Sequence, residues 1–293
     1  MSANFYRVIA AMSAPEIEPP DIDPKSFHDF EHAGWQRAAG DYHRHFGSLT
    51  SQAIGPLLDA VGQPAANESK LLDIAAGPGY VSAEAARRGW LVTGVDFSES
   101  MLALAHRIHP EIEFRHGDAE ALELGDASFE AAVMNFGVLH LAQPEAALRE
   151  AFRVIRSGGR FAFTAWATPD KTPGFRIVLD AVAEFGDPNV MLPSGPPFFR
   201  FSDANESRRA LEAAGFVNAL IEEIPLVWRL NSAADFVEAF LKGSARTGGL
   251  LNAQQPSALA KIRAAVEQHI AAFSRLGHLE IPMPAVVASA RKR

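Results

Sequence analysis

Asp73 and the small residues that follow it form the part of the sequence best suited to bind a charged ligand. Asp73 lies in the apolar run Leu71–Ala75, which continues into Gly77-Pro78-Gly79. Small residues let a ligand lie close against the backbone, and N–H groups at the start of a following helix can face it. The Asp73 carboxylate can accept a hydrogen bond from an ammonium group, directly or through water.

Two further carboxylates follow apolar runs and suit a nucleoside. Asp96 lies 23 residues after Asp73, and nucleotide-binding α/β folds place an acidic residue for the ribose hydroxyls at about that distance. Asp118 can accept from the exocyclic amine of adenine, and the next backbone N–H can donate to a ring nitrogen. Apolar contacts with the adenine are expected from Phe97 and Met101.

Strand-like and helix-like segments alternate from Lys70 to Trp166, and they must position these carboxylates. Alternation of this length implies a parallel sheet with right-handed crossovers. Strands are expected at 71–75, 91–95, 112–115, 131–135 and 160–166. Helices are expected at 81–88, 98–107 and 144–155, with Ser98 as a cap and Gly158-Gly159 ending the last one.

The rest of the chain is less regular but completes a doubly wound α/β fold. A helix is expected at 31–46, before the sheet, carrying Trp35, Tyr42 and Phe46. Beyond Trp166, helices are expected at 175–185, 205–214, 233–241 and 257–273, and strands within 216–228 and 279–288. The prediction is therefore a mostly parallel, seven-stranded sheet with helical cap segments.

The composition excludes several classes of protein. With 293 residues and 48% apolar content, the chain can bury a full core, yet it has no run of about 18 apolar residues for a membrane span. It has no cysteine, which excludes disulfides and thiolate chemistry and is consistent with a cytoplasmic location. The net charge of −8 argues against a nucleic-acid-binding surface.

The N-terminal segment carries no clear signal. Residues 4–14 are too weakly patterned for a secretory signal peptide. The segment Pro15–Pro24 is proline-rich and acidic, and a flexible lead-in is expected there.

The ordered set of carboxylates and glycines resembles the class I S-adenosylmethionine-dependent methyltransferases over roughly residues 40–230, most strongly from Leu71 to Trp166. The resemblance assigns cofactor contacts to Asp73, Ala75, Gly77, Gly79, Asp96, Asp118 and Ala119. It places Asn135-Phe136-Gly137 near the methyl group. Many relatives carry glycine where this chain has Ala75, so we expect a slight change in cofactor position there.

The segment from Gly34 to Gly47 is similar to the N-terminal helix of the ubiquinone/menaquinone-type, small-molecule methyltransferases. The resemblance implies that Tyr42 covers S-adenosylmethionine. It also implies a lid in residues 1–45 and a methyltransferase domain in 46–293, with cap insertions at about 168–200 and 231–275. The implied partner is a small organic acceptor and not a nucleic acid, and a homodimer is compatible with this assignment.

His140 is the candidate general base, because it follows the fourth predicted strand at the edge where substrates bind. Methyl transfer needs the acceptor aligned about 3 to 3.5 Å behind the methyl group, and a base only if the acceptor must lose a proton. The plainer interpretation, which the sequence favours, is that His140 packs and hydrogen-bonds locally to shape its loop.

The candidate acceptor residues are Trp166 and the segment Ser194–Arg200. Phe198 and Phe199 can line an apolar pocket and Arg200 can bind an anionic group, although such a loop is equally often a rigid cover. His28 and His32 have the i, i+4 spacing of metal ligands, but no third ligand is evident. We therefore expect no metal site.

The sequence also bears on three other functions. A dinucleotide-binding oxidoreductase needs a third glycine where this chain has Ser82, and it has no use for Asp73. A relative that performs cyclisation or decarboxylation with a bound cofactor would have the same pocket, so the sequence leaves this alternative open. A non-catalytic subunit should have a degraded site, whereas this one is intact.

Overall fold

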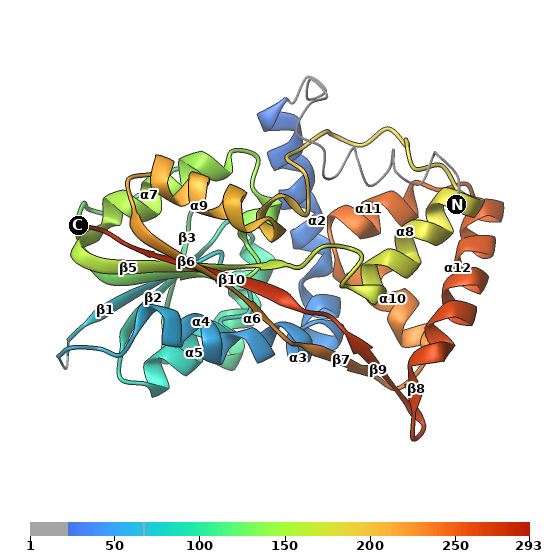
Figure 1. Ribbon diagram of the computed structural model, residues 1–293, viewed down its shortest axis with the longest axis horizontal. Coiled ribbons are helices and arrows are strands. Elements are labelled where there is room, and N and C mark those ends of the chain that lie inside the picture. The colour runs from blue at the N-terminus through green and yellow to red at the C-terminus, as the bar shows by residue number, and fades with distance from the viewer. Residues whose placement is uncertain (1–22, 67) are drawn as a thin grey trace.

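A seven-stranded sheet in the order β3-β2-β1-β4-β5-β10-β6 organises the chain in the computed structural model (Figure 1), which describes residues 23–66 and 68–293. The strands are β1 (Lys70–Ile74), β2 (Leu91–Asp96), β3 (Glu113–His116), β4 (Phe129–Met134), β5 (Ile155–Trp166), β6 (Val217–Ile224) and β10 (Ala285–Arg291). Strand β10 is antiparallel to both of its neighbours, β5 and β6, and the other pairs in this sheet are parallel. The predicted fold class is confirmed, whereas residues 4–14 and nearly all of Pro15–Pro24 lie outside the described residues.

Helices cover both faces of this sheet because successive strand residues point to opposite sides. Leu71 packs into a cluster with α4 (Ile54–Val61), α5 (Tyr80–Arg87) and α6 (Glu99–Ile108). The next residue, Leu72, belongs to the cluster on the other face, which also contains residues of α7 (Pro144–Val154) and α9 (Ala204–Ala213). The layers of a doubly wound fold follow from this alternation.

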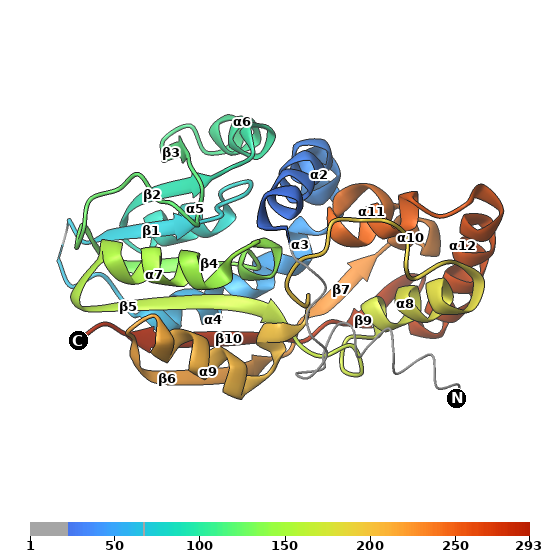
Figure 2. The same cartoon turned by 90° about the horizontal axis from the view of Figure 1, so that it is seen from above.

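Helix α2 (Pro24–His45) lies beside the carboxyl ends of the parallel strands (Figure 2). It begins seven residues before the predicted helix because Asp23 caps it, accepting a hydrogen bond from Lys25 N at 3.1 Å. Pro24 suits the first turn, where a missing N–H costs nothing. The proline that was expected to belong to a flexible lead-in therefore starts a helix of 22 residues.

Beyond α2 lies a second layer, which the sequence predicted only in part. Its helices are α8 (Pro173–Phe185), α10 (Ala233–Gly243), α11 (Arg246–Asn252) and α12 (Pro256–Ile270). A small sheet, in the order β7-β9-β8, packs with them and contains β7 (Val227–Leu230), β8 (Ser274–Arg275) and β9 (His278–Pro282). Figures 1 and 2 place α2 between this layer and the seven-stranded sheet.

Proline explains why two predicted strands are each divided. Pro225 separates β6 from β7, and Pro284 precedes β10. Proline cannot donate to a ladder, so the chain leaves one sheet and enters the other at these points. Ile224 and Ala285 remain register partners across β6 and β10.

Three local expectations were wrong or incomplete. Gly158-Gly159 does not end a helix, because α7 ends at Val154 and the two glycines lie inside β5. Helix α4 was not foreseen. Helix α11 was not foreseen either, and it contains Gly248 and Gly249, which are weak helix formers.

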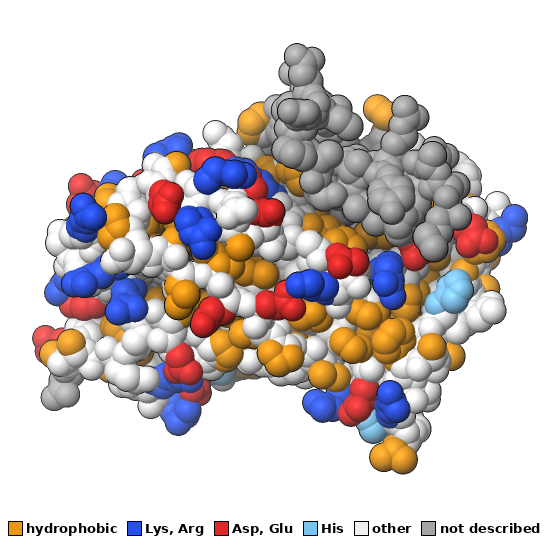
Figure 3. All heavy atoms as spheres, viewed as in Figure 1, with side chains coloured by type: hydrophobic (Ala, Val, Ile, Leu, Met, Phe, Trp, Pro, Cys, Tyr) orange, Lys and Arg blue, Asp and Glu red, His pale blue; other side chains and the backbone are white. Residues whose placement is uncertain are grey.

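The face drawn in Figure 3 carries basic and acidic side chains interspersed over the sheet half, and hydrophobic side chains gather toward the second layer. Among the described residues, none of the helices is long and apolar enough to cross a membrane.

Close packing of α2 against the second layer depends on Gly34. An added Cβ there would lie 2.6 Å from Ala245 Cβ. This distance is too short, so α2 and the segment that contains Ala245 would have to move apart. Gly40 is on the same helix but exposed, with nothing within 4 Å of its own added Cβ.

Alanine at these two positions should therefore have opposite effects on stability. We expect Gly34→Ala to lower the free energy of unfolding by about 1–2 kcal/mol, because overpacking outweighs the gain in helix propensity. We expect Gly40→Ala to raise it by up to about 1 kcal/mol. Urea denaturation measures both, and equal stabilisation by the two variants would contradict the packing argument.

Candidate functional site

The carboxyl ends of five parallel strands form one wall of a cavity of about 1250 Å³, counting its open mouth. Because the strand order is β3-β2-β1-β4-β5, the residues at these ends lie in a row. The row runs through Asp118, Asp96, Asp73, Asn135 and Trp166. At about 4.8 Å per strand step it is about 19 Å long, which is long enough for an extended ligand beside a second small molecule.

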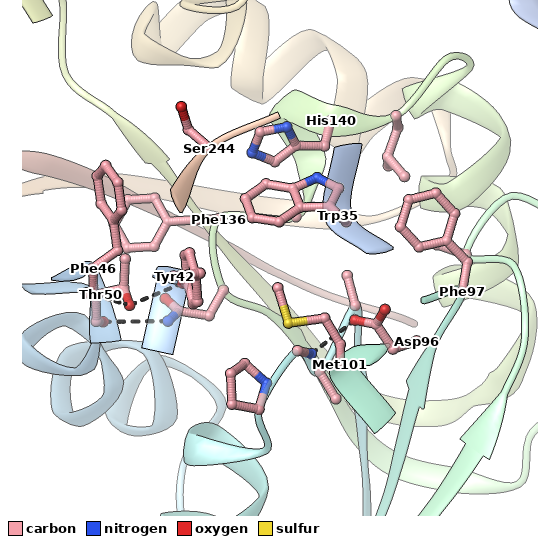
Figure 4. Close-up of a pocket in the computed structure, with 18 of the residues that line it drawn as sticks. Trp35, Tyr42, Phe46, Thr50, Asp96, Phe97, Met101, Phe136, His140 and Ser244 are labelled. Carbon is pink, nitrogen blue, oxygen red and sulfur yellow. Dashed lines mark hydrogen bonds between the residues drawn. The ribbon is translucent and has the colours of Figure 1, made fainter. Parts of the chain in front are cut away.

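Helix α2 and the α10–α11 junction form the opposite wall. The lining residues from α2 are His28, Trp35 and Tyr42, and those from the junction are Gly243, Ser244, Arg246 and Thr247. Figure 4 shows Trp35 beside His140 on one side of the cavity, and Asp96, Phe97 and Met101 on the other. Residues predicted from separate parts of the sequence thus surround one space.

All of the predicted site residues line this cavity except Gly79, Phe199 and Arg200. Gly77 has a φ of +53°, and an added Cβ would meet nothing within 4 Å, so a side chain there would extend into the cavity. Gly79 lies behind it. Its φ is +81° and an added Cβ would lie 2.5 Å from the Phe114 ring, so glycine at 79 is needed for backbone conformation and packing.

Asp73 is a fully buried carboxylate with incomplete hydrogen bonding. Ser82 Oγ donates to Asp73 Oδ2 at 2.6 Å, whereas Asp73 Oδ1 has no partner among the described residues. Burial raises the pKa of Asp73 to about 7. A buried acceptor oxygen without a donor costs free energy, which a ligand that donates to it would recover.

Asp96 is held by the backbone of the two loops that flank it. Gly77 N donates to Asp96 Oδ2 and Ser98 N donates to Asp96 Oδ1, each at 2.8 Å. Burial raises the pKa of Asp96 to about 6, although these two hydrogen bonds oppose the rise. Each carboxylate oxygen can accept a second hydrogen bond, so the side chain remains able to bind two hydroxyl groups.

The β3 end of the cavity combines a carboxylate with aromatic rings. His28 Nε2 lies 3.2 Å from Asp118 Oδ2, and Glu120 N donates to Asp118 Oδ1 at 2.8 Å. The rings of His28 and His32 each meet the Phe97 ring edge-on, at centroid distances of 5.5 and 5.3 Å. Ala119 is buried and lines the same end.

Two residues without the freedom of glycine adopt left-handed backbone conformations beside the cavity. Ala75, after β1, and Phe136, after β4, both have a φ of +55°. Such conformations cost of order 1–2 kcal/mol for an L residue, and strained backbone often accompanies functional sites. The Phe136 ring stacks on Trp166 at a centroid distance of 4.1 Å, so the strained turn sets an aromatic wall.

His140 has a partner that the sequence did not reveal. Its Nδ1 lies 3.0 Å from Glu31 Oε2, on the buried side of α2. The only sequence signal was position, because Glu31 shares the buried stripe of α2 with apolar and small residues. That stripe is Phe27, Glu31, Gly34 and Ala38.

The predicted anion-binding role of Arg200 has no support in the geometry. Arg200 Nη2 lies 2.6 Å from Glu145, and its Nε donates to Glu206 at 2.9 Å, outside the cavity. Phe199 packs on Phe198, with ring centroids 5.0 Å apart. The cation that does line the cavity is Arg246, in a helix that the sequence did not predict.

Within residues 23–66 and 68–293, no group of three or more His, Asp or Glu side chains is arranged to hold a metal ion. His32 instead lies 3.4 Å from Glu99. Ser98 Oγ and Ser100 N both donate to Gln36 Oε1, at 3.1 and 2.8 Å. These contacts tie α2 to the start of α6.

The fold and the row of strand-end carboxylates define a class I, S-adenosylmethionine-dependent methyltransferase architecture. Residues 72–163 match the family model described as a methyltransferase domain. The match covers β1 to β5, where the cofactor wall was predicted.

Curated relatives carry methyltransferase names, and a solved structure shares the fold. The chain is 39% identical over 122 residues, 42% of its length, to half of a demethylmenaquinone methyltransferase of Renibacterium salmoninarum. It is 37% identical over 119 residues, 38% of its length, to 47% of a ubiquinone/menaquinone biosynthesis C-methyltransferase UbiE of Nitrobacter hamburgensis. The chain thus spans about half the length of these relatives. The YcgJ protein of Bacillus subtilis superposes with a TM-score of 0.54 at 19% identity, covering 83% of this chain and 98% of that one.

The unpartnered carboxylate of Asp73 should make stability depend on pH in a particular direction. Its pKa is higher in the folded chain than in the unfolded chain, so the contribution of Asp73 to stability falls as pH rises from about 4 through 7. The difference in free energy of unfolding between Asp73→Asn and the wild type should therefore grow in favour of the variant by up to about 4 kcal/mol over that interval, at 1.36 kcal/mol per pKa unit.

Urea denaturation at several pH values measures this gain. Asp170→Asn is the matched control, because Asp170 is exposed. The difference in stability between this variant and the wild type should change little with pH. A pH-independent difference between Asp73→Asn and wild type would contradict the assignment of a costly buried charge.

Proposed function

We propose that this protein transfers a methyl group from S-adenosylmethionine to a small organic molecule at oxygen, nitrogen or carbon. The observation that carries the proposal is the row of Asp118, Asp96 and Asp73 along one wall of a cavity whose other end is aromatic. The methyltransferase-domain match over residues 72–163 supports it.

The residues of this chain fit the cofactor. Asp73 Oδ1 is a buried acceptor without a donor among the described residues, which suits an ammonium group. Asp96 has acceptor capacity for the ribose hydroxyls, and Gly77 leaves space that a Cβ would fill. Asp118, Phe97 and Met101 would hold the adenine. When bound, the cofactor supplies a methyl group that is already activated for transfer.

We propose that α2 is a lid and that residues 168–200 and 231–275 are cap insertions that exclude water. Tyr42 Oη is 3.0 Å from Thr50 Oγ1, and its ring stacks on Phe46 at 5.9 Å, so the side chain is fixed where it lines the cavity. Exclusion of water favours methyl transfer over side reactions.

The β5 end of the cavity, where the acceptor would bind, favours a small organic molecule over a nucleic acid. Its lining includes Trp166, Phe175 and Phe198, all largely buried. Together with a net charge of −8, an apolar and enclosed pocket suits an uncharged or aromatic acceptor. Transfer of label from methyl-labelled cofactor separates methylation from cyclisation or decarboxylation in the same pocket, because the latter would form product without label.

Calorimetric titration with S-adenosylmethionine and S-adenosylhomocysteine tests the cofactor site. We expect micromolar dissociation constants for the wild type and a loss of about 10- to 100-fold in Asp96→Ala, which removes charge-assisted hydrogen bonds. Asp170→Ala, an exposed carboxylate outside the cavity, should bind as the wild type does. Absence of binding to a folded wild type would refute the proposal.

Cofactor affinity should also fall at acidic pH. Because the pKa of Asp73 is about 7 without ligand, an ammonium ligand must displace a proton below that pH. Binding at pH 5 should be weaker than at pH 8 by up to about 100-fold, ten-fold for each unit below the pKa. Asp73→Asn should bind weakly and flatten this profile, and an unchanged profile would remove Asp73 from the site.

A further inference from the structure

Glu31 is a buried carboxylate with two hydrogen-bonding neighbours at Oε2 and an arginine near Oε1, which has no hydrogen-bond partner among the described residues. The side chain is 0% exposed. Trp35 Nε1 donates to Glu31 Oε2 at 3.1 Å, and His140 Nδ1 lies 3.0 Å from the same oxygen. Arg246 Nε lies 3.9 Å from Glu31 Oε1. A carboxylate inside a helix interface is costly to bury and is retained only where its partners require it.

The contact with Glu31 favours one tautomer of the His140 imidazole. A carboxylate accepts only, so Nδ1 must carry the proton, and Nε2 of the neutral ring then holds the free electron pair. No described residue hydrogen-bonds to Nε2, and His140 lines the cavity. The His140 ring makes edge-on contacts with Trp35 and Phe198, at distances of 4.8 and 5.9 Å between ring centroids.

Arg246 balances the charge of this group and fixes its far side. Its Nη1 donates to the carbonyl oxygens of Leu139 and Pro196, at 3.3 and 2.9 Å. Its guanidinium lies over the rings of Phe27 and Phe198, at 5.0 and 5.5 Å from their centroids. Burial lowers the pKa of Arg246, but an arginine remains charged in proteins.

The remaining acceptor wall is aromatic, with one stacked pair of rings and a third ring inclined to it by 58°. Phe136 is stacked on Trp166, and Phe175 packs against both Trp166 and Phe198, at centroid distances of 5.5 and 5.4 Å. Aromatic walls favour planar molecules through offset and edge contacts. His140, whose Nε2 can accept a proton, thus lines the same cavity as this aromatic wall.

We propose that Glu31 is a positioning residue that holds His140 as the proton acceptor, and that the acceptor molecule is a planar compound with an ionisable hydroxyl group. The inference rests on the proposed methyl transfer and deepens it. His140 Nε2 takes the hydroxyl proton, and the electron pair stays on the acceptor. The acceptor forms its new bond to the methyl carbon as the carbon–sulfur bond breaks, and that electron pair goes to sulfur. The proton leaves later from His140 to solvent.

The first test needs no turnover. Nitrogen-15 NMR of the full chain, bound to S-adenosylhomocysteine or free, reports the tautomer of His140, whose signals are assigned by their loss in His140→Gln. We expect the Nδ1–H tautomer in the wild type and a shift toward Nε2–H in Glu31→Gln. Glu145→Gln, outside the cavity, is the matched control and should match the wild type. A dominant Nε2–H tautomer in the wild type would overturn the positioning role.

The second test measures methylation of hydroxyl compounds of graded acidity, from 2-naphthol to 4-nitrophenol and pentafluorophenol. We expect kcat for 2-naphthol to fall about 10- to 100-fold in Glu31→Gln, as is typical when the partner that orients a histidine is removed. The loss should shrink for the more acidic phenols, which ionise without help. His140→Gln should show the same trend, and the calorimetric cofactor affinity of both variants should stay within about threefold of wild type.

The outcomes distinguish failure of this inference from failure of the proposed methyltransferase function on which it rests. No cofactor binding by the wild type would refute the proposed function itself. Cofactor binding without methylation of any hydroxyl compound would overturn the acceptor class and leave the cofactor site standing. Equal losses for all phenols in Glu31→Gln would assign Glu31 a purely structural role.

Discussion

The parallel register of β3, β2, β1, β4 and β5 is the constraint on which the site depends. Parallel strands end at the same edge, so side chains separated by tens of residues in the chain meet along one line. Asp118, Asp96 and Asp73 lie in a row because β3, β2 and β1 are neighbours in the sheet. Any change that slipped one strand by a residue would turn its carboxylate to the opposite face.

This arrangement carries a stability cost that the rest of the fold must offset. Two buried carboxylates have pKa values of about 7 and 6, and two left-handed residues without the freedom of glycine stand at neighbouring strand ends. The surrounding core is dense and apolar on both faces of the sheet. A well-packed apolar core combined with strained backbone and buried charges at one edge of the sheet is expected where that edge binds a ligand.

The sequence predicted the sheet and the row of strand-end carboxylates because their signals are local. Strands β1, β2 and β4 are short and largely apolar, and each of the three carboxylates lies within two residues of a strand end. Ser98 was correctly identified as a cap, since its hydroxyl accepts from Met101 N at 3.3 Å. Glu31 could not be paired with His140 in the same way, because the contact joins residues 109 positions apart and depends on how α2 packs.

The second layer was harder to predict for a related reason. Its elements are defined by contacts with one another and with α2, and not by strong periodicity. The small sheet appears only because Pro225 and Pro284 divide what reads as two continuous strands. Arg246 was missed because its helix is short and contains two glycines, although its buried guanidinium is the cation that lines the cavity.

Strands β6 and β10 are antiparallel neighbours, with Ile224 and Ala285 directly opposite each other. Neighbours of this kind are commonly joined by a tight turn of a few residues, yet here the 60 residues from 225 to 284 lie between them. Much of the second layer is therefore a single insertion that leaves and re-enters the seven-stranded sheet at one point. Because Ile224 and Ala285 stay paired across this point, the length and content of the insertion can change without changing the register of the sheet.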